Sequence, residues 1–231
     1  MNKKLFKLVE TLNKKLSRVQ GDAYLEPEQF AWVSQVEQSC EAIKAELAGL
    51  IDQEGVEVPT MAELSGGNSS VKHTNSWRAL CLYLYGQRLS HQENFLPHTH
   101  AALQKIPGLK TAFLSILQPG TSIKPHRGPY NGVLRYHLGV SIPAGDCAIV
   151  VDEQQRGWAN GKSLIFDDSY VHKAWNHTEE TRVVLFVDFL RPLPFWYAWF
   201  NTLIYNRLCR GEFQVKFMQR AAQSTENMVK A

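Results

Sequence analysis

The sequence predicts a mainly β domain, an antiparallel sandwich or barrel, with helical segments at both ends. Between residues 111 and 190 apolar residues recur at every second position, the spacing that turns one face of a strand toward a core. Turn signals separate these short runs: PG, GPYNG, PAGD and WANG, in chain order. Many short strands at such intervals, with no internal repeat, favour a sandwich or barrel.

The N-terminal part has helical spacing instead. Residues 3–18 predict an amphipathic helix, with lysines opposite an apolar stripe. This stripe is Leu5, Leu8, Val9, Leu12 and Leu16. Such a basic helix suits docking on the domain, or lying on a membrane surface or a partner. Residues 27–50 predict a second helix, with Pro27 in its first turn.

Between this helical part and the strand-rich region the pattern is mixed. Residues 51–76 are polar and rich in glycine and serine, so a loop is predicted, of the kind that often closes over a site. Trp77–Tyr85 predicts a strand and His98–Pro107 a short helix. For the pair His98 and His100 we expect solvated or helix-capping roles, because no acidic residue or third histidine accompanies it.

The C-terminal part, residues 193–231, is aromatic at first and then basic. It predicts a helix that packs on the barrel or on a second subunit, or that lies at a membrane interface, because Trp and Tyr beside basic residues suit that zone. The resulting organisation is a helical extension and loop (1–73), a β core (74–192) and a C-terminal helical extension (193–231).

Composition narrows the class of protein. The net charge of +3 is too small to indicate nucleic-acid binding, and the positive charge gathers in the first 20 residues. Four cysteines without CxxC spacing fit reduced thiols. Neither a secretory signal nor an apolar run of about 18 residues is evident. We therefore expect a cytoplasmic protein, with peripheral membrane contact through its basic ends as an alternative.

Polar side chains interrupt otherwise apolar strands. In the strand 134–142, Arg135 and His137 share a face with small residues, which indicates the wall of a polar cavity. Arg182 is the one cation in the strand 181–190, and a buried guanidinium needs an anion, for which a carboxylate has the matching geometry. Ser115 is the one polar side chain in the strand 112–117 and could add a hydroxyl donor.

Two histidines lie beside strand-like runs far apart in the sequence. His126 is predicted in a turn after a strand, and His172 follows a strand as well. Two imidazoles at strand ends suit a divalent transition metal, although core or supporting histidines fit the spacing too. The usual iron site adds a carboxylate two residues after the first histidine, and here that position is Gly128.

Two stretches carry a resemblance to a known family: PGTSIKPHRGPYNGVLRYHLGVSIP, and then NGKSLIFDDSYVHKAWNHTEETRVVLFVDFLRP after a tryptophan. Residues 74–192 resemble the aspartyl/asparaginyl β-hydroxylases, which are Fe(II)- and 2-oxoglutarate-dependent dioxygenases with a jelly-roll (double-stranded β-helix, cupin-like) core. The resemblance implies this fold and this chemistry, with succinate and CO2 as coproducts. It also accounts for Gly128, because members keep a glycine where other iron enzymes have a carboxylate.

By position, the resemblance implies that His126 and His172 bind iron and that Arg182 holds the distal carboxylate of 2-oxoglutarate, assisted by Ser115. Arg135 and His137 then face the cosubstrate or the substrate. Asp168 is a candidate to orient an imidazole, or a residue of a turn. Trp158 and Trp175 are expected to have packing roles.

The resemblance implies O2 and a peptide, amino-acid or lipid as partners, because relatives hydroxylate Asp or Asn side chains or a lipid acyl chain. We expect an Asp/Asn-type substrate, with a lipid acyl chain at a membrane surface as the alternative. A non-enzymatic jelly-roll binding module, or a cupin-like metalloenzyme of another chemistry, would fit the fold as well. An oligomer is compatible with the sequence.

Overall fold

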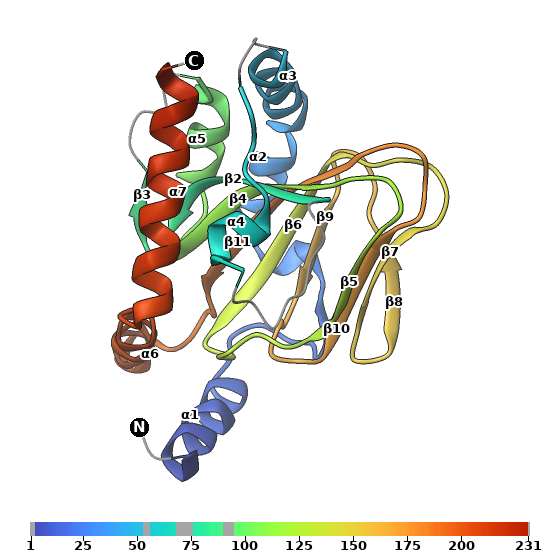
Figure 1. Ribbon diagram of the computed structural model, residues 1–231. Helices are drawn as coiled ribbons and strands as arrows, with labels where there is room; N and C mark the ends of the chain where they lie inside the picture. The colour runs from blue at the N-terminus through green and yellow to red at the C-terminus, as the bar shows by residue number, and fades with distance from the viewer. Residues whose placement is uncertain (1–2, 53–55, 68–75, 90–94, 231) are drawn as a thin grey trace.

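The computed structural model describes residues 3–52, 56–67, 76–89 and 95–230, and its centre is a pair of antiparallel β-sheets (Figure 1). The seven-stranded sheet has the order β1-β9-β6-β11-β4-β2-β3, and the four-stranded sheet has the order β5-β10-β7-β8. The strands are β1 (Tyr24–Leu25), β2 (Trp77–Leu84), β3 (Gln87–Arg88), β4 (Leu109–Leu117), β5 (Thr121–His126), β6 (Val133–Ser141), β7 (Cys147–Val151), β8 (Gln154–Gly157), β9 (Ser163–Phe166), β10 (His172–Asn176) and β11 (Arg182–Leu190).

The strands β4 to β11 form a jelly roll. The chain passes repeatedly from one sheet to the other, because β4, β6, β9 and β11 belong to the large sheet and β5, β7, β8 and β10 to the small one. Every pairing within the two sheets is antiparallel. The predicted mainly β, jelly-roll fold with helices at both ends is confirmed.

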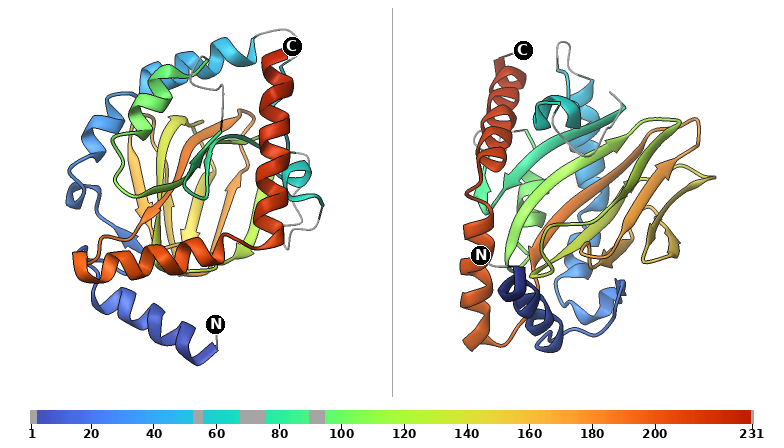
Figure 2. Two further views of the ribbon diagram at one scale, coloured as in Figure 1. Left: turned by 90° about the vertical axis from the view of Figure 1, so that its left-hand side faces the viewer. Right: turned by 60° about the horizontal axis from the view of Figure 1, so that its bottom comes forward.

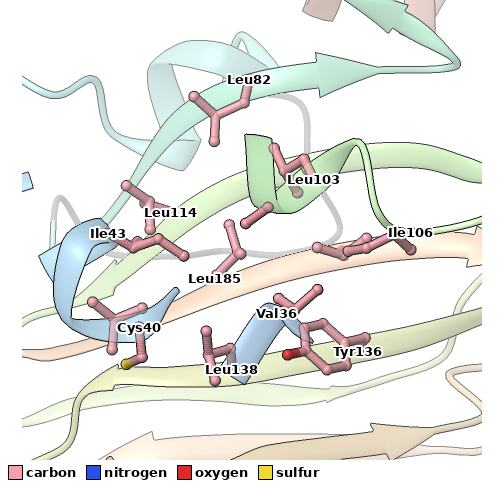
Figure 3. Close-up of a cluster of buried hydrophobic side chains, with 14 of the residues drawn as sticks. Val36, Cys40, Ile43, Leu82, Leu103, Ile106, Leu114, Tyr136, Leu138 and Leu185 are labelled. Carbon is pink, nitrogen blue, oxygen red and sulfur yellow. The ribbon is translucent and has the colours of Figure 1, made fainter. Parts of the chain in front are cut away.

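The two faces of the large sheet bury different apolar sets, as the alternation in sequence predicts. Leu114, Leu138 and Leu185 point to the outer face, where they pack against α2 (Val33–Glu37), α3 (Cys40–Ile51) and α5 (Pro97–Leu103) (Figure 3). Val184 and Phe186 point the other way, into the space between the sheets. The polar residues of the candidate site lie on this inner side.

The predicted helix over residues 27–50 is wrong as a single element. The structure has a short 3-10 helix (η1, Pro27–Gln29), then α2 and α3. Phe30 is extended, with φ −119° and ψ 102°, and its ring packs edge-on against Phe189 at 5.5 Å. Trp32 packs in the same way against Tyr136 at 5.0 Å. Docking of these two aromatic rings on the sheet breaks the helix that local periodicity favours.

The loop predicted for residues 51–76 contains an additional helix, α4 (Met61–Ser65). Thr60 Oγ1 accepts from the N–H of Glu63, and the Glu63 carboxylate accepts from the N–H of Thr60. The sequence contains the T-x-x-E pattern that is typical of such a capping box. Residues 53–55 and 68–75 lie outside the described part, and so does the predicted boundary at 73/74.

Three further helices flank the barrel: α1 (Lys3–Lys15), α6 (Phe195–Leu208) and α7 (Glu212–Lys230). The predicted N-terminal helix is confirmed, and the C-terminal extension forms two helices rather than one. Figure 2 shows α1 and α6 side by side at one end of the molecule, with α7 running from α6 along the edge of the large sheet. None of the helices in the described residues has the length and apolar character needed to cross a bilayer.

Candidate active site

His126 and His172 face each other at the open end of the small sheet. They are partners in the register of β5 and β10, and their ring centroids lie 4.2 Å apart. His126 Nδ1 lies 2.8 Å from the carbonyl oxygen of Lys124, and His172 Nδ1 lies 2.9 Å from that of Tyr170. A carbonyl can only accept, so each Nδ1 carries the proton and each Nε2 keeps its lone pair.

Both imidazoles are therefore in the tautomer that a metal ligand needs, and each is held by the same bond to a carbonyl two residues earlier. Burial, together with Arg135 and the neighbouring imidazole, lowers the pKa of His172 to about 3. Burial also lowers the pKa of His126 below its ordinary value. Neutral rings with unprotonated Nε2 atoms suit a divalent transition metal.

No group of three His, Cys, Asp or Glu side chains close enough to hold an ion occurs among the described residues. A metal at His126 and His172 would thus take its other ligands from water or from a small molecule. This donor set fits an iron ion that binds a bidentate oxo-acid, because such an ion needs several open positions.

Arg182 is a buried cation without a carboxylate among the described residues. Its side chain is 2% exposed, and Nη1 makes two contacts of 3.4 Å, to the carbonyl oxygen and to Oγ of Ser115. Nε has no hydrogen-bond partner within the part of the chain that the structure describes, and the guanidinium lies over the ring of Trp158 at 4.8 Å. Burial lowers the pKa of Arg182 to about 10, because removal from water disfavours the charged guanidinium.

His137 lies between Arg182 and the histidine pair. Its Nδ1 accepts a hydrogen bond of 3.2 Å from the indole N–H of Trp158, so the ring proton is on Nε2. That nitrogen is buried and has no partner in the structure. Burial and the cations Arg182 and Arg135 hold the pKa of His137 well below its usual range. His137 is thus a neutral ring whose Nε2–H is a buried donor without a partner among the described residues.

Arg135 is ion-paired with two carboxylates. Its Nε and Nη2 donate to the two oxygens of Asp188 at 2.8 and 3.1 Å, and Nη2 lies 2.8 Å from Oδ2 of Asp168. Nη1 is 3.4 Å from His172 Nε2, so the guanidinium borders the space in front of that nitrogen. Because Arg135 already binds two carboxylates, its role is to hold neighbouring side chains of the site in place, and not to bind a further anion.

The fold brings together the residues that the sequence pointed to: His126, His172, Arg182, Ser115, His137, Arg135 and Asp168. Asp168 contacts Arg135 and not an imidazole, because both Nδ1 atoms already donate to carbonyls. His98 and His100 lie on α5, where the N–H of His98 donates to Glu46 and His100 packs beside Tyr83.

Sequence reasoning missed the roles of three residues in this site. Trp158 was taken for a packing residue, and it bonds to His137 and stacks on Arg182. Trp77 Nε1 donates to Ser115 Oγ at 2.9 Å and so helps to fix the hydroxyl oxygen that Arg182 Nη1 also contacts. Asp188 lies opposite Arg135, which only the pairing of β11 with β6 shows.

A model of the aspartyl/asparaginyl beta-hydroxylase family matches residues 37–192, a range that includes every residue of this site. This chain belongs to that family. The family unites aspartyl/asparaginyl hydroxylases with lipid acyl hydroxylases, as two similar proteins illustrate.

The chain is 43% identical over 186 residues to the ornithine lipid ester-linked acyl 2-hydroxylase of Rhizobium tropici, an alignment that covers 80% of this chain and 66% of that protein. It is 33% identical over 150 residues to the aspartyl/asparaginyl beta-hydroxylase of Homo sapiens, covering 62% of this chain and 20% of the human protein. The chain thus spans less than two thirds of the length of either relative.

Solved structures with similar strands are cupin domains. One is the Cupin_2 domain of an XRE family transcriptional regulator from Enterobacter cloacae, with a TM-score of 0.35 and 14% identity over 49% of this chain and 96% of that one. Another is the cupin domain of Schizosaccharomyces pombe Cnp3, with a TM-score of 0.36 and 12% identity over 62% and 79%. The assignment of the jelly-roll fold rests on the strand order itself.

Proposed function

We propose that this protein is an Fe(II)- and 2-oxoglutarate-dependent hydroxylase that releases succinate and CO2. One observation carries the proposal: two neutral imidazoles with unprotonated Nε2 atoms lie on the inner side of the jelly roll, as does a buried arginine that has no carboxylate among the described residues. A metal and a dicarboxylate together satisfy both groups.

Each side chain then has a defined task. His126 and His172 hold the metal through Nε2. Arg182, with the hydroxyl of Ser115, binds the far carboxylate of the oxo-acid and so selects one orientation of it. His137 donates from Nε2 to an oxygen of the same ligand. When bound, iron and the oxo-acid supply the activation of O2 for hydroxylation of an unactivated C–H bond.

For the substrate we propose an acyl chain of a lipid. The alignment with the lipid acyl hydroxylase from Rhizobium tropici is longer and of higher identity than the alignment with the human protein. An Asp/Asn-type substrate, the expectation from sequence, is the second candidate, and the family match favours it. Cytoplasmic localisation remains a prediction; all four cysteines are free, as that compartment requires.

The decisive experiment is an anaerobic titration of the protein with Fe(II) and 2-oxoglutarate, followed by the visible charge-transfer band of the iron chelate and by bound iron. We expect one iron per chain and a band that is lost in His126→Ala and in His172→Ala. Succinate formation without substrate should disappear in the same variants.

His177→Ala is the matched control, because His177 follows the same strand but bonds to Ser122 and Asp146 in an exposed position. It should keep the band and the bound iron. A band that survives in both site variants, or a folded wild-type protein that binds no iron under these conditions, would overturn the proposal in favour of a non-enzymatic jelly-roll module. If iron binding is as expected, assays for hydroxylated products with lipid and with peptide substrates distinguish the two substrate classes.

A further inference from the structure

Helix α6 is apolar on both of its faces. Tyr197, Ile204 and Tyr205 pack against the domain and are buried. On the other side the side chains of Phe195 and Trp199 are 83% and 63% exposed, as large apolar groups seldom are on a free surface. A helix that is apolar all round is normally covered on all sides.

Helix α1 extends this surface. It packs beside α6 through Phe6 and Val9, and the two helices stay adjacent in Figures 1 and 2. Among the described residues ten large apolar side chains are exposed, and six of them lie on these two helices. We call these six the α1–α6 face: Leu5, Leu8, Phe195, Trp196, Trp199 and Leu203.

The charges around the α1–α6 face are mostly positive. Helix α1 carries five lysines and a single acid, Glu10, which lies 4.0 Å from Arg127. Helix α6 has no acidic residue and has Arg207 in its last turn. Exposed tryptophans flanked by lysine and arginine are the composition of surfaces that lie in the headgroup region of an anionic bilayer.

This face is attached to the turn that follows His126 of the candidate active site. Asn13 of α1 donates to Asn131 at 3.1 Å, and Tyr130 donates to Asn201 of α6 at 2.6 Å. Tyr130 and Asn131 belong to the turn that begins directly after His126. Asn13 and Asn201 are at most 1% exposed, so these bonds hold both helices against that turn.

A basic hollow of about 330 Å³ lies between α1 and the residues that flank the two histidines. Lys7 and Lys14 line it from the helix, Arg127 follows His126, and Tyr170 comes two residues before His172. Lys14 Nζ lies 4.0 Å from the centre of the Tyr170 ring. Three cations against one carboxylate suit an anionic headgroup next to the metal site.

We propose that the α1–α6 face docks on an anionic lipid bilayer and holds the turn after His126, with the basic hollow beside it, close to the lipid headgroups. The apolar side chains enter the headgroup region while the lysines of α1 contact lipid phosphates. The docking proposal depends only on these surface residues. Delivery of an acyl chain to the candidate active site rests on the proposed function. Both helices lie entirely outside residues 37–192, so the face is an addition to the family core.

The test is co-sedimentation of the full chain with vesicles of phosphatidylglycerol and phosphatidylcholine, compared with vesicles of phosphatidylcholine alone. Wild type should bind the anionic vesicles. The double substitution Trp196→Ser/Trp199→Ser should weaken the partition coefficient tenfold or more, to about the level of a helix without anchors. Lys3→Gln/Lys15→Gln should weaken it by about 30-fold, and added salt should do the same.

Two matched controls keep the test specific. Phe213→Ser/Val215→Ser removes exposed apolar side chains from α7, and Lys44→Gln removes an exposed lysine from α3. Both should bind vesicles like wild type, and all variants should show native circular dichroism. Absence of vesicle binding by the folded wild type, or unchanged binding by the tryptophan variant, would overturn the proposal.

A second copy of the chain is the competing occupant of this face. A wild-type dimer in light scattering that Trp196→Ser/Trp199→Ser turns into monomers, without vesicle binding, would assign the face to self-association and overturn the proposal. Succinate formation in the absence of lipid separates this outcome from the proposed function. The rate of succinate formation should be equal in wild type and in the tryptophan variant. If the wild type forms no succinate, the proposed chemistry is contradicted and the docking proposal is unaffected.

Discussion

The carboxylate of Asp168 occupies the space next to Gly128 that a side chain at this position would need. A Cβ built on Gly128 would lie 2.0 Å from Asp168 Oδ2 and 2.4 Å from its Cγ. The N–H of Gly128 also donates to the backbone carbonyl of Asp168 at 2.7 Å. The glycine is thus required by a carboxylate from another part of the chain, which is itself ion-paired with Arg135.

Gly128→Ala should therefore lower the free energy of unfolding by about 1–3 kcal/mol, because the methyl group overpacks a buried contact. In an Asp168→Ala background the same change should cost less than about 0.5 kcal/mol, since the two residues are coupled. Urea denaturation of the four proteins measures this cycle. Gly49→Ala is the control: nothing lies within 4 Å of its Cβ, and in α3 it should stabilise by up to about 1 kcal/mol. Equal stability of Gly128→Ala and wild type would contradict the steric argument.

Arg182→Met should separate stability from cosubstrate binding. The guanidinium is buried and has no carboxylate among the described residues, so its replacement by an apolar side chain should leave the melting temperature unchanged or raise it. The affinity for 2-oxoglutarate should fall about 100-fold or more, as expected for loss of a buried charge-assisted pair. Calorimetric titration and thermal unfolding measure the two effects.

Arg182→Lys serves as the conservative comparison, because it keeps the charge and loses the planar fork. We expect intermediate affinity from it. A large drop in the melting temperature of Arg182→Met would show instead that the guanidinium is a structural group, with no ligand required to satisfy it.

Much of this site followed from strand periodicity alone. Because side chains alternate along a strand, the placement of Arg135 and His137 on one face and of Leu134 and Tyr136 on the other could be predicted without the structure. What could not be predicted is the partner across the strands. Asp188 stands opposite Arg135 only because β11 pairs with β6 in that register, and strand order is a tertiary property.

The same limit explains the wrong helix over residues 27–50. Local spacing favoured one helix, while the burial of Phe30 and Trp32 against β6 and β11 favoured a break, and the tertiary contacts prevailed. Trp158 was undervalued for a similar reason. Its contacts, His137 and Arg182, come from two other strands, so nothing near it in sequence indicated a role.

Arg135→Leu tests whether Arg135 binds the cosubstrate or holds the site together. The change leaves the buried Asp168 and the partly buried Asp188 without their cation, so the free energy of unfolding should fall by about 3–5 kcal/mol. Arg156→Leu removes an arginine whose pair with Glu26 is exposed, and it should cost no more than about 1 kcal/mol. Chemical denaturation compares them. A stable Arg135→Leu protein with weakened 2-oxoglutarate binding would show instead that Arg135 binds the cosubstrate.

Trp158→Phe tests Trp158 as a positioning residue. The indole N–H fixes the proton of His137 on Nε2, and the ring supports the guanidinium of Arg182. Without the indole donor, Nδ1 of His137 is an unpaired buried acceptor and the two tautomers approach each other in free energy. We expect the affinity for 2-oxoglutarate to fall about tenfold, and the nitrogen resonances of His137 to move from a single tautomer toward a mixture.

Trp175→Phe is the matched control, since its indole N–H donates to Asp146 on the protein surface. It should change neither the affinity nor the imidazole spectrum. A purely structural role for Trp158 would lower stability and leave the tautomer of His137 as it is. Weakened binding together with a mixed tautomer means that Trp158 acts through His137, which makes an indole from the β8–β9 connection part of how this family member orients its ligand.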